Sequence, residues 1–133
     1  MPEEFRNKVK PLIEKYKKQV TYYGPYESKD LPGLMQEIDW VVMPSVWWEN
    51  SPLVIQEAFK YGRPMIVSNI GGLAEKVVDK QDGLHFRAGN AMDLAEKIES
   101  IAVNNLMWDS LQEGLPITLN TKQCAEEHLK LYD

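Results

Sequence analysis

Glu57 is placed so that its carboxylate could serve a polar ligand. It follows Glu49 after seven intervening residues, and the apolar spacing after Pro52 predicts a helix over residues 53–61. Glu57 falls about one turn into this helix. Because helical side chains tilt toward the N-terminus, its carboxylate can reach a ligand bound at the helix start. A carboxylate accepts two hydrogen bonds at once, which suits a vicinal diol such as that of a ribose.

The start of the same helix predicts an anion site. The first amides of a helix have no internal partners and carry a partial positive charge, so those near Ser51, Leu53 and Val54 are free to hold a phosphate. Pro52 lacks an N–H, but at the first helical position that N–H would be unused. A second interpretation stays open, in which Ser51 merely caps the helix and Glu57 is a solvated surface charge.

Short apolar runs alternate with helical patterns along the chain and must position this segment. Strands are predicted over 20–23, 40–43, 65–67 and 84–87, and helices over 3–18, 31–37, 53–61, 73–79 and most of the chain after Ala91. This order predicts an α/β fold, a Rossmann-like parallel sheet with helices on both faces. The run over 40–43 does not alternate, which is typical of a strand covered on both faces. Ligands of such sheets bind where strands end, which places the site after Tyr23, Met43 and Val67.

The composition limits the classes of protein to which the chain can belong. It has 133 residues and a mass of 15.3 kDa, enough for a single domain over residues 1–133. The net charge of −5 argues against nucleic acid as a partner, and no apolar run is long enough to span a bilayer. Cys124 is the only cysteine, so a reducing, cytoplasmic location is expected. One cysteine and the distant His85 and His128 predict no metal site.

Several short motifs follow one another between residues 15 and 100. The Glu-x7-Glu pair is preceded by an apolar run ending in Pro44-Ser45 and followed by Gly62-Arg63-Pro64, Gly71-Gly72 and Asp82-Gly83-Leu84-His85-Phe86. Together with Val20–Gly24, this ordered set resembles the retaining glycosyltransferases of family 4 (group 1), which have the GT-B fold. The resemblance implies that the chain corresponds to the C-terminal, donor-binding domain of such an enzyme.

The resemblance also implies roles for the residues of the predicted site. Glu57 would hold the ribose hydroxyls of the donor. Glu49, the catalytic candidate, would contact the transferred sugar or stabilise charge near its anomeric centre. The amides of Leu53 and Val54 would hold the diphosphate. Further donor-binding residues implied by the resemblance are Ser45, Asn50, Ser51, Gly24 and Tyr26, the last of which either stacks on the base or is a plain loop aromatic.

Two pairs of neighbouring residues near this site leave alternatives open. Gly71 and Gly72 either let the backbone pass close to the ligand or simply make a turn. Trp47 and Trp48 point in different directions if the chain is extended there, so one is expected to pack inward and the other to line the acceptor cleft.

The chain differs from the family at its beginning. Nothing before residue 19 resembles the family's Arg/Lys loop, so the resemblance implies a truncated domain, inactive by itself, whose acceptor domain is a missing partner. Its ligand would be a nucleotide-diphosphate sugar, with no cofactor and no metal ion. An open sheet edge or the final helix would favour self-association. The parent enzyme would be cytoplasmic or peripheral to the inner membrane. The alternative interpretation is a non-catalytic flavodoxin-like α/β binding or interaction module.

Overall fold

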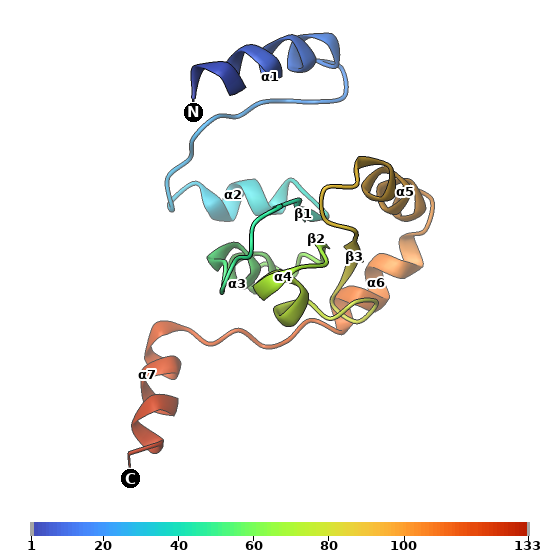
Figure 1. Ribbon diagram of the computed structural model, residues 1–133. Coiled ribbons are helices and arrows are strands. Elements are labelled where there is room, and N and C mark those ends of the chain that lie inside the picture. The colour runs from blue at the N-terminus through green and yellow to red at the C-terminus, as the bar shows by residue number, and fades with distance from the viewer. Residues whose placement is uncertain (1, 133) are drawn as a thin grey trace. The chain divides into compact units, whose positions relative to one another are not determined.

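The computed structural model describes residues 2–132 of the chain (Figure 1). The chain divides into two compact units, residues 1–31 and 32–133, and each is described by itself. The expected single domain over residues 1–133 therefore stays a prediction.

The first unit holds one helix, α1 (Glu3–Lys15), and an irregular segment. The predicted helix over 3–18 is confirmed, although it ends earlier. The strand predicted over 20–23 is wrong, because residues 20–27 belong to no helix or strand. A short apolar run becomes a strand only where a neighbouring strand completes its ladder of hydrogen bonds. The three strands that pair in the described part of the chain all lie after residue 40.

The second unit is built on a parallel sheet of three strands. They are β1 (Val41–Met43), β2 (Met65–Ser68) and β3 (Gly83–Phe86), in the order β1-β2-β3. Val41 lies opposite Met65, and Met65 lies opposite Gly83. Every residue of the central strand β2 is buried. The expectation that the first of these strands is covered on both faces is wrong, because Val42 is 41% exposed on one face. β1 is also an edge strand of the three-stranded sheet.

Helices cover both faces of this sheet (Figure 1). Successive side chains of β2 point to opposite faces. Met65 and Val67 join a hydrophobic cluster with α3 (Leu53–Lys60) and α4 (Gly71–Lys76). Ile66 joins a second cluster with α5 (Ala91–Ala102) and α6 (Asn105–Glu113). The predicted α/β fold, with a parallel sheet between helices, is confirmed.

The remaining helices are α2 (Leu31–Gln36), which precedes β1, and α7 (Thr121–Lys130), which buries no residue. The helix predicted over 53–61 corresponds to α3, which stops before Gly62, a glycine with φ of 69°. The helix predicted over 73–79 begins two residues earlier, at Gly71, and ends where Val77 turns into extended, buried chain. Within residues 2–132, no helix combines the length and the apolar character that crossing a membrane requires.

Candidate functional site

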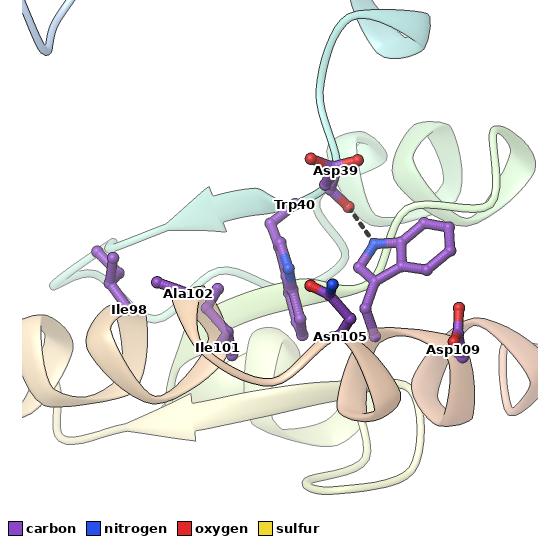
Figure 2. Close-up of a pocket in the computed structure, with 8 residues that line it drawn as sticks. Asp39, Trp40, Ile98, Ile101, Ala102, Asn105 and Asp109 are labelled. Atoms are coloured by element: carbon purple, nitrogen blue, oxygen red, sulfur yellow. Dashed lines mark hydrogen bonds between the residues drawn. The ribbon is translucent and has the colours of Figure 1, made fainter.

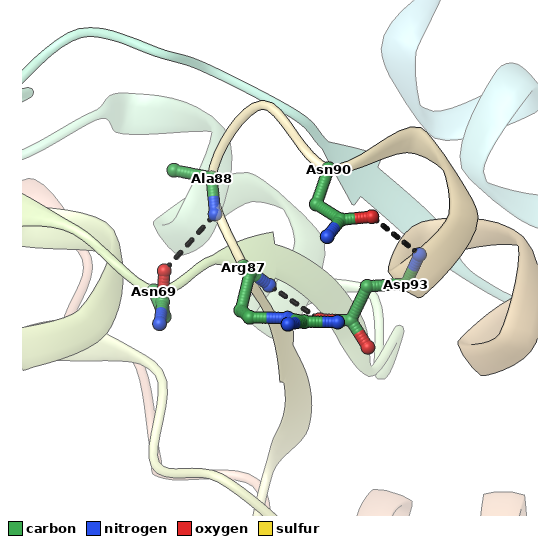
Figure 3. A network of polar contacts seen from close by, with 5 residues as sticks. All are labelled: Asn69, Arg87, Ala88, Asn90 and Asp93. Carbon is green, nitrogen blue, oxygen red and sulfur yellow. Dashed lines mark hydrogen bonds and ion pairs between the residues drawn. The ribbon is translucent and has the colours of Figure 1, made fainter.

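Three loops meet at the carboxyl edge of the sheet, where ligands of parallel sheets bind. They follow β1, β2 and β3. The Asn69 Oδ1 atom accepts a hydrogen bond of 3.0 Å from the Ala88 amide, which joins the second loop to the third (Figure 3). A Cβ atom on Gly89 would lie 3.9 Å from Val46 Cγ1, which brings the third loop against the first. The first loop, residues 44–52, carries most of the predicted site residues.

Hydrogen bonds fix the conformation of the loop around Glu49. The Ser45 hydroxyl accepts from the Trp47 amide at 3.2 Å and donates to Glu49 Oε1 at 3.4 Å. The Glu49 amide donates to the Trp47 carbonyl at 3.0 Å. Glu49 and Ser45 are both half-buried. The hydroxyl of Ser45 therefore orients the carboxylate of Glu49, the predicted catalytic candidate.

The start of α3 presents free backbone amides. Pro52 occupies the N-cap position, and no side chain of residues 2–132 caps the helix, so the interpretation in which Ser51 caps it is wrong. The Ile55 amide donates to the Pro52 carbonyl at 3.2 Å. The amides of Leu53 and Val54 lack intrahelical acceptors because they lie in the first turn. The positive end of the helix and these two donors make an arrangement that can hold an anion.

Glu57 lies one turn into α3 and is half-buried. Its carboxylate has no hydrogen-bond or ion-pair partner among residues 2–132, and Asn50 and Ser51 are exposed beside the helix start. The structure thus places most of the predicted residues on one loop and the helix that follows it, namely Ser45, Glu49, Asn50, Ser51, Leu53, Val54 and Glu57. Gly24, with φ of 75°, and the exposed Tyr26 belong to the first unit, so their part in this site stays a prediction.

Both tryptophans of the loop face solvent. Trp47 is 76% exposed and Trp48 is 81% exposed, so the expectation that one of them packs inward is wrong. The chain turns at this point, because the Ser45 hydroxyl bonds to the Trp47 amide. Extended-chain alternation therefore does not apply, and both indoles project from the rim of the site.

A polar network beside the third loop was not predicted from the sequence (Figure 3). The Asp93 carboxylate accepts from the Arg87 amide at 2.7 Å and lies 3.4 Å from Arg87 Nε. The amide hydrogen bond is the larger of the causes that hold the pKa of Asp93 below its usual value. The Asn90 side chain caps α5 by accepting from the Asp93 amide. An asparagine three residues before an aspartate at a predicted helix start is the sequence signal that could have found this cap.

A cavity of about 430 Å³ lies at the opposite end of β1 (Figure 2). Asp39 and Trp40, which precede β1, line it together with residues of α5 and α6. Trp108 Nε1 donates to the Asp39 carbonyl at 2.8 Å and closes one side. The cavity is therefore separate from the loops that carry the predicted site. Within residues 2–132, no three Asp, Glu, His or Cys side chains are grouped so that they could hold a metal ion.

Comparisons with known proteins place the chain in a family. Residues 3–115 match the family described as glycosyl transferases group 1. The chain is 34% identical over 119 residues to N,N'-diacetylbacillosaminyl-diphospho-undecaprenol alpha-1,3-N-acetylgalactosaminyltransferase of Campylobacter jejuni, covering 86% of this chain and 30% of that protein. It is 34% identical over 82 residues to D-inositol 3-phosphate glycosyltransferase of an Arthrobacter species, covering 62% and 19%.

Solved structures agree with this assignment. Sucrose-phosphate synthase of Thermosynechococcus elongatus superposes with a TM-score of 0.80 at 27% identity, over 97% of this chain and 34% of that one. HepE of Anabaena, solved in complex with UDP, superposes with a TM-score of 0.78 at 21% identity, over 96% and 37%, and shares the fold. The chain spans about a third or less of the length of these relatives. It belongs to the glycosyl transferases group 1 family, and its second unit has the fold of GT-B C-terminal domains.

Proposed function

We propose that this chain is the donor-binding part of a retaining glycosyltransferase of family 4, and that it binds a nucleotide-diphosphate sugar. The observation that carries the proposal is the start of α3, where the amides of Leu53 and Val54 lack intrahelical acceptors. One turn away lies the carboxylate of Glu57, which has no partner among the residues that the structure describes. Phosphate oxygens are the acceptors that such amides suit, and a ribose diol is the donor pair that a carboxylate suits.

Each part of the site takes one part of the donor in this proposal. The Leu53 and Val54 amides bind the diphosphate, and the Glu57 carboxylate accepts from the two ribose hydroxyls. Glu49, held by Ser45, contacts the transferred sugar and stabilises charge that develops near its anomeric carbon. Asn50 and Ser51 contact the donor beside the helix start.

UDP and UDP-glucose are the donors to test first, because solved neighbours of the same fold hold them. The chain spans about a third of those proteins, so we propose donor binding for it and assign sugar transfer to the longer proteins of the family. The family match over residues 3–115 argues against the flavodoxin-like alternative.

A nuclear magnetic resonance titration with UDP tests the proposal. We expect the amide signals of Leu53 and Val54 to shift as the diphosphate binds. Glu57→Gln should weaken binding by about 1.5–3 kcal/mol, roughly ten- to a hundredfold, because a charge-assisted pair is lost. Glu96→Gln, a matched change of an exposed glutamate on α5, should leave the affinity unchanged. UDP that shifts neither amide, or equal affinities of the parent and Glu57→Gln, would contradict the proposal.

A further inference from the structure

The loop that carries Glu49 rests on the first turn of α4. The Gly72 amide donates a hydrogen bond of 2.5 Å to the Glu49 carbonyl. Gly72 is buried there, although its neighbour Gly71 is only half-buried. The contact joins residues more than twenty positions apart, from the loop after β1 and the helix after β2. It therefore fixes where the Glu49 backbone lies relative to the sheet.

Only glycine allows this approach at position 72. A Cβ atom on Gly72 would lie 2.6 Å from both the Glu49 oxygen and the Asn50 carbonyl carbon, and closer still to the Asn50 oxygen. On Gly71, which has φ of 54°, a Cβ atom would lie 3.0 Å from the Glu49 oxygen and 3.2 Å from Trp48 Cα. Backbone atoms cannot move aside as a flexible side chain can. The glycine pair is thus required by the neighbouring loop and not merely by its own turn.

The side chain of Glu49 has a separate anchor on its own loop. The Ser45 hydroxyl donates to Glu49 Oε1 at 3.4 Å and accepts from the Trp47 amide at 3.2 Å. Gly72 thus holds the backbone of Glu49, and Ser45 holds its carboxylate. Neither contact involves the α3 amides or Glu57, which belong to the next part of the chain.

We propose that Gly72 is a positioning residue that sets the place of Glu49, and that Ser45 sets the direction of its carboxylate. This inference rests on the proposed function, in which Glu49 contacts the sugar of the donor. Two parts of the site therefore contribute separately to donor affinity. Gly72 and Ser45 determine how much more tightly UDP-glucose binds than UDP, whereas α3 determines the affinity for the nucleotide itself.

The indole signals of the four tryptophans test the positioning without any ligand. We expect Gly72→Ala to shift the indole N–H signals of Trp47 and Trp48, because both lie in the displaced loop directly before Glu49, and to leave those of Trp40 and Trp108 in place. A purely structural role would move all four or none. Gly33→Ala is the matched control, because a Cβ atom on Gly33 meets nothing within 4 Å. It should shift neither loop indole.

Titrations with UDP and UDP-glucose test the coupling to the donor. We expect the parent chain to bind UDP-glucose more tightly than UDP, and Gly72→Ala to lose most of that difference while its UDP affinity stays within about twofold. Ser45→Ala should lose about tenfold in UDP-glucose affinity, as expected for one hydrogen bond to a charged group. Ser45→Thr, which keeps the hydroxyl, should restore it.

The possible failures are distinguishable. If the parent binds neither ligand, the proposed function fails, and the indole signals still decide whether Gly72 positions the loop. The positioning role is overturned if the parent binds UDP-glucose and Gly72→Ala changes neither the preference for UDP-glucose over UDP nor the indole N–H signals of Trp47 and Trp48. If Gly72→Ala does not fold, Ser45→Ala and Ser45→Thr decide, and equal UDP-glucose affinities of these two variants overturn the inference.

Discussion

Glu57 is the residue on which the ligand interpretation and the surface-charge interpretation differ most. If its carboxylate accepts from both ribose hydroxyls, UDP should bind more tightly than 2′-deoxy-UDP, and the difference should shrink by about 1 kcal/mol or more in Glu57→Gln. Calorimetric titration of both variants with both ligands measures this coupling. The substitution should change the unfolding free energy by no more than about 0.5 kcal/mol. If the preference for UDP over 2′-deoxy-UDP is the same in the parent and in Glu57→Gln, Glu57 is a solvated surface charge.

Ser68 is a second residue with a specific expectation. It ends the central strand β2, is fully buried, and has a hydroxyl without a hydrogen-bond partner among the described residues. A buried hydroxyl without a partner lowers stability, so Ser68→Ala should raise the unfolding free energy by about 1 kcal/mol. Urea unfolding measures the change. A loss of stability on this substitution would show that the hydroxyl is bonded in solution.

At the scale of elements, Asp93 links the end of β3 to the start of α5. The Arg87 amide holds the pKa of Asp93 below its usual value of 3.8. An acid whose pKa is lowered by folding adds stability above its unfolded pKa, and this stability is lost as the pH falls through the folded pKa. We therefore expect Asp93→Asn to have a lower melting temperature than the parent at neutral pH. This difference in melting temperature should become smaller as the pH falls below the ordinary aspartate pKa. A difference in melting temperature that does not change with pH would contradict the stabilising role of the ionised Asp93.

Asp82, in the turn before β3, should behave in the opposite way. It is 3% exposed, and burial raises its pKa above 3.8, although its Oδ1 accepts from the Val78 amide at 2.7 Å. An acid with a raised folded pKa costs stability as the pH rises from its unfolded pKa through its folded pKa. Asp82→Asn keeps an acceptor for Val78 without the charge, so its melting temperature relative to the parent should increase over that window. If the melting temperatures of Asp82→Asn and Asp93→Asn, each relative to the parent, changed with pH in the same direction, the opposite effects expected for the two acids would be refuted.

At the scale of the whole molecule, the feature with the clearest consequence is the side of β1 on which no described strand pairs with it. β1 lies at the edge of the sheet and Val42 is 41% exposed, and unprotected edges pair with other chains. We expect the chain to self-associate with rising concentration in sedimentation velocity. Val42→Lys should suppress association because it places a charge on the edge strand. Val103→Lys, at an 85% exposed position after α5, should not. If the parent chain stays monomeric at high concentration, the edge strand β1 does not pair with a second copy of the chain.

The exposed helix α7 offers a second surface for the same association. It buries no residue, and Leu129 and Leu131 are 64% and 80% exposed at its end. If Val42→Lys still associates, Leu129→Glu separates the two surfaces: monomer formation by the double variant alone would assign association to both of them.

The sequence by itself determined those features that depend on neighbouring residues. The helix after Pro52, its open first turn and the place of Glu57 one turn inside it all follow from local backbone geometry. The parallel sheet with helices on both faces likewise follows from the alternation of apolar runs and helical patterns.

Only the tertiary structure decided the features that depend on contacts between residues far apart in the sequence. Residues 20–23 have strand-forming side chains, but a strand exists only where another strand completes its ladder. The exposure of Trp47 and Trp48 follows from a turn that the Ser45 hydroxyl stabilises. The role of Gly72 was not visible along the chain, because the atoms that exclude a Cβ there belong to Glu49 and Asn50. Such close approaches arise only when the sheet brings its loops together, which local sequence does not encode.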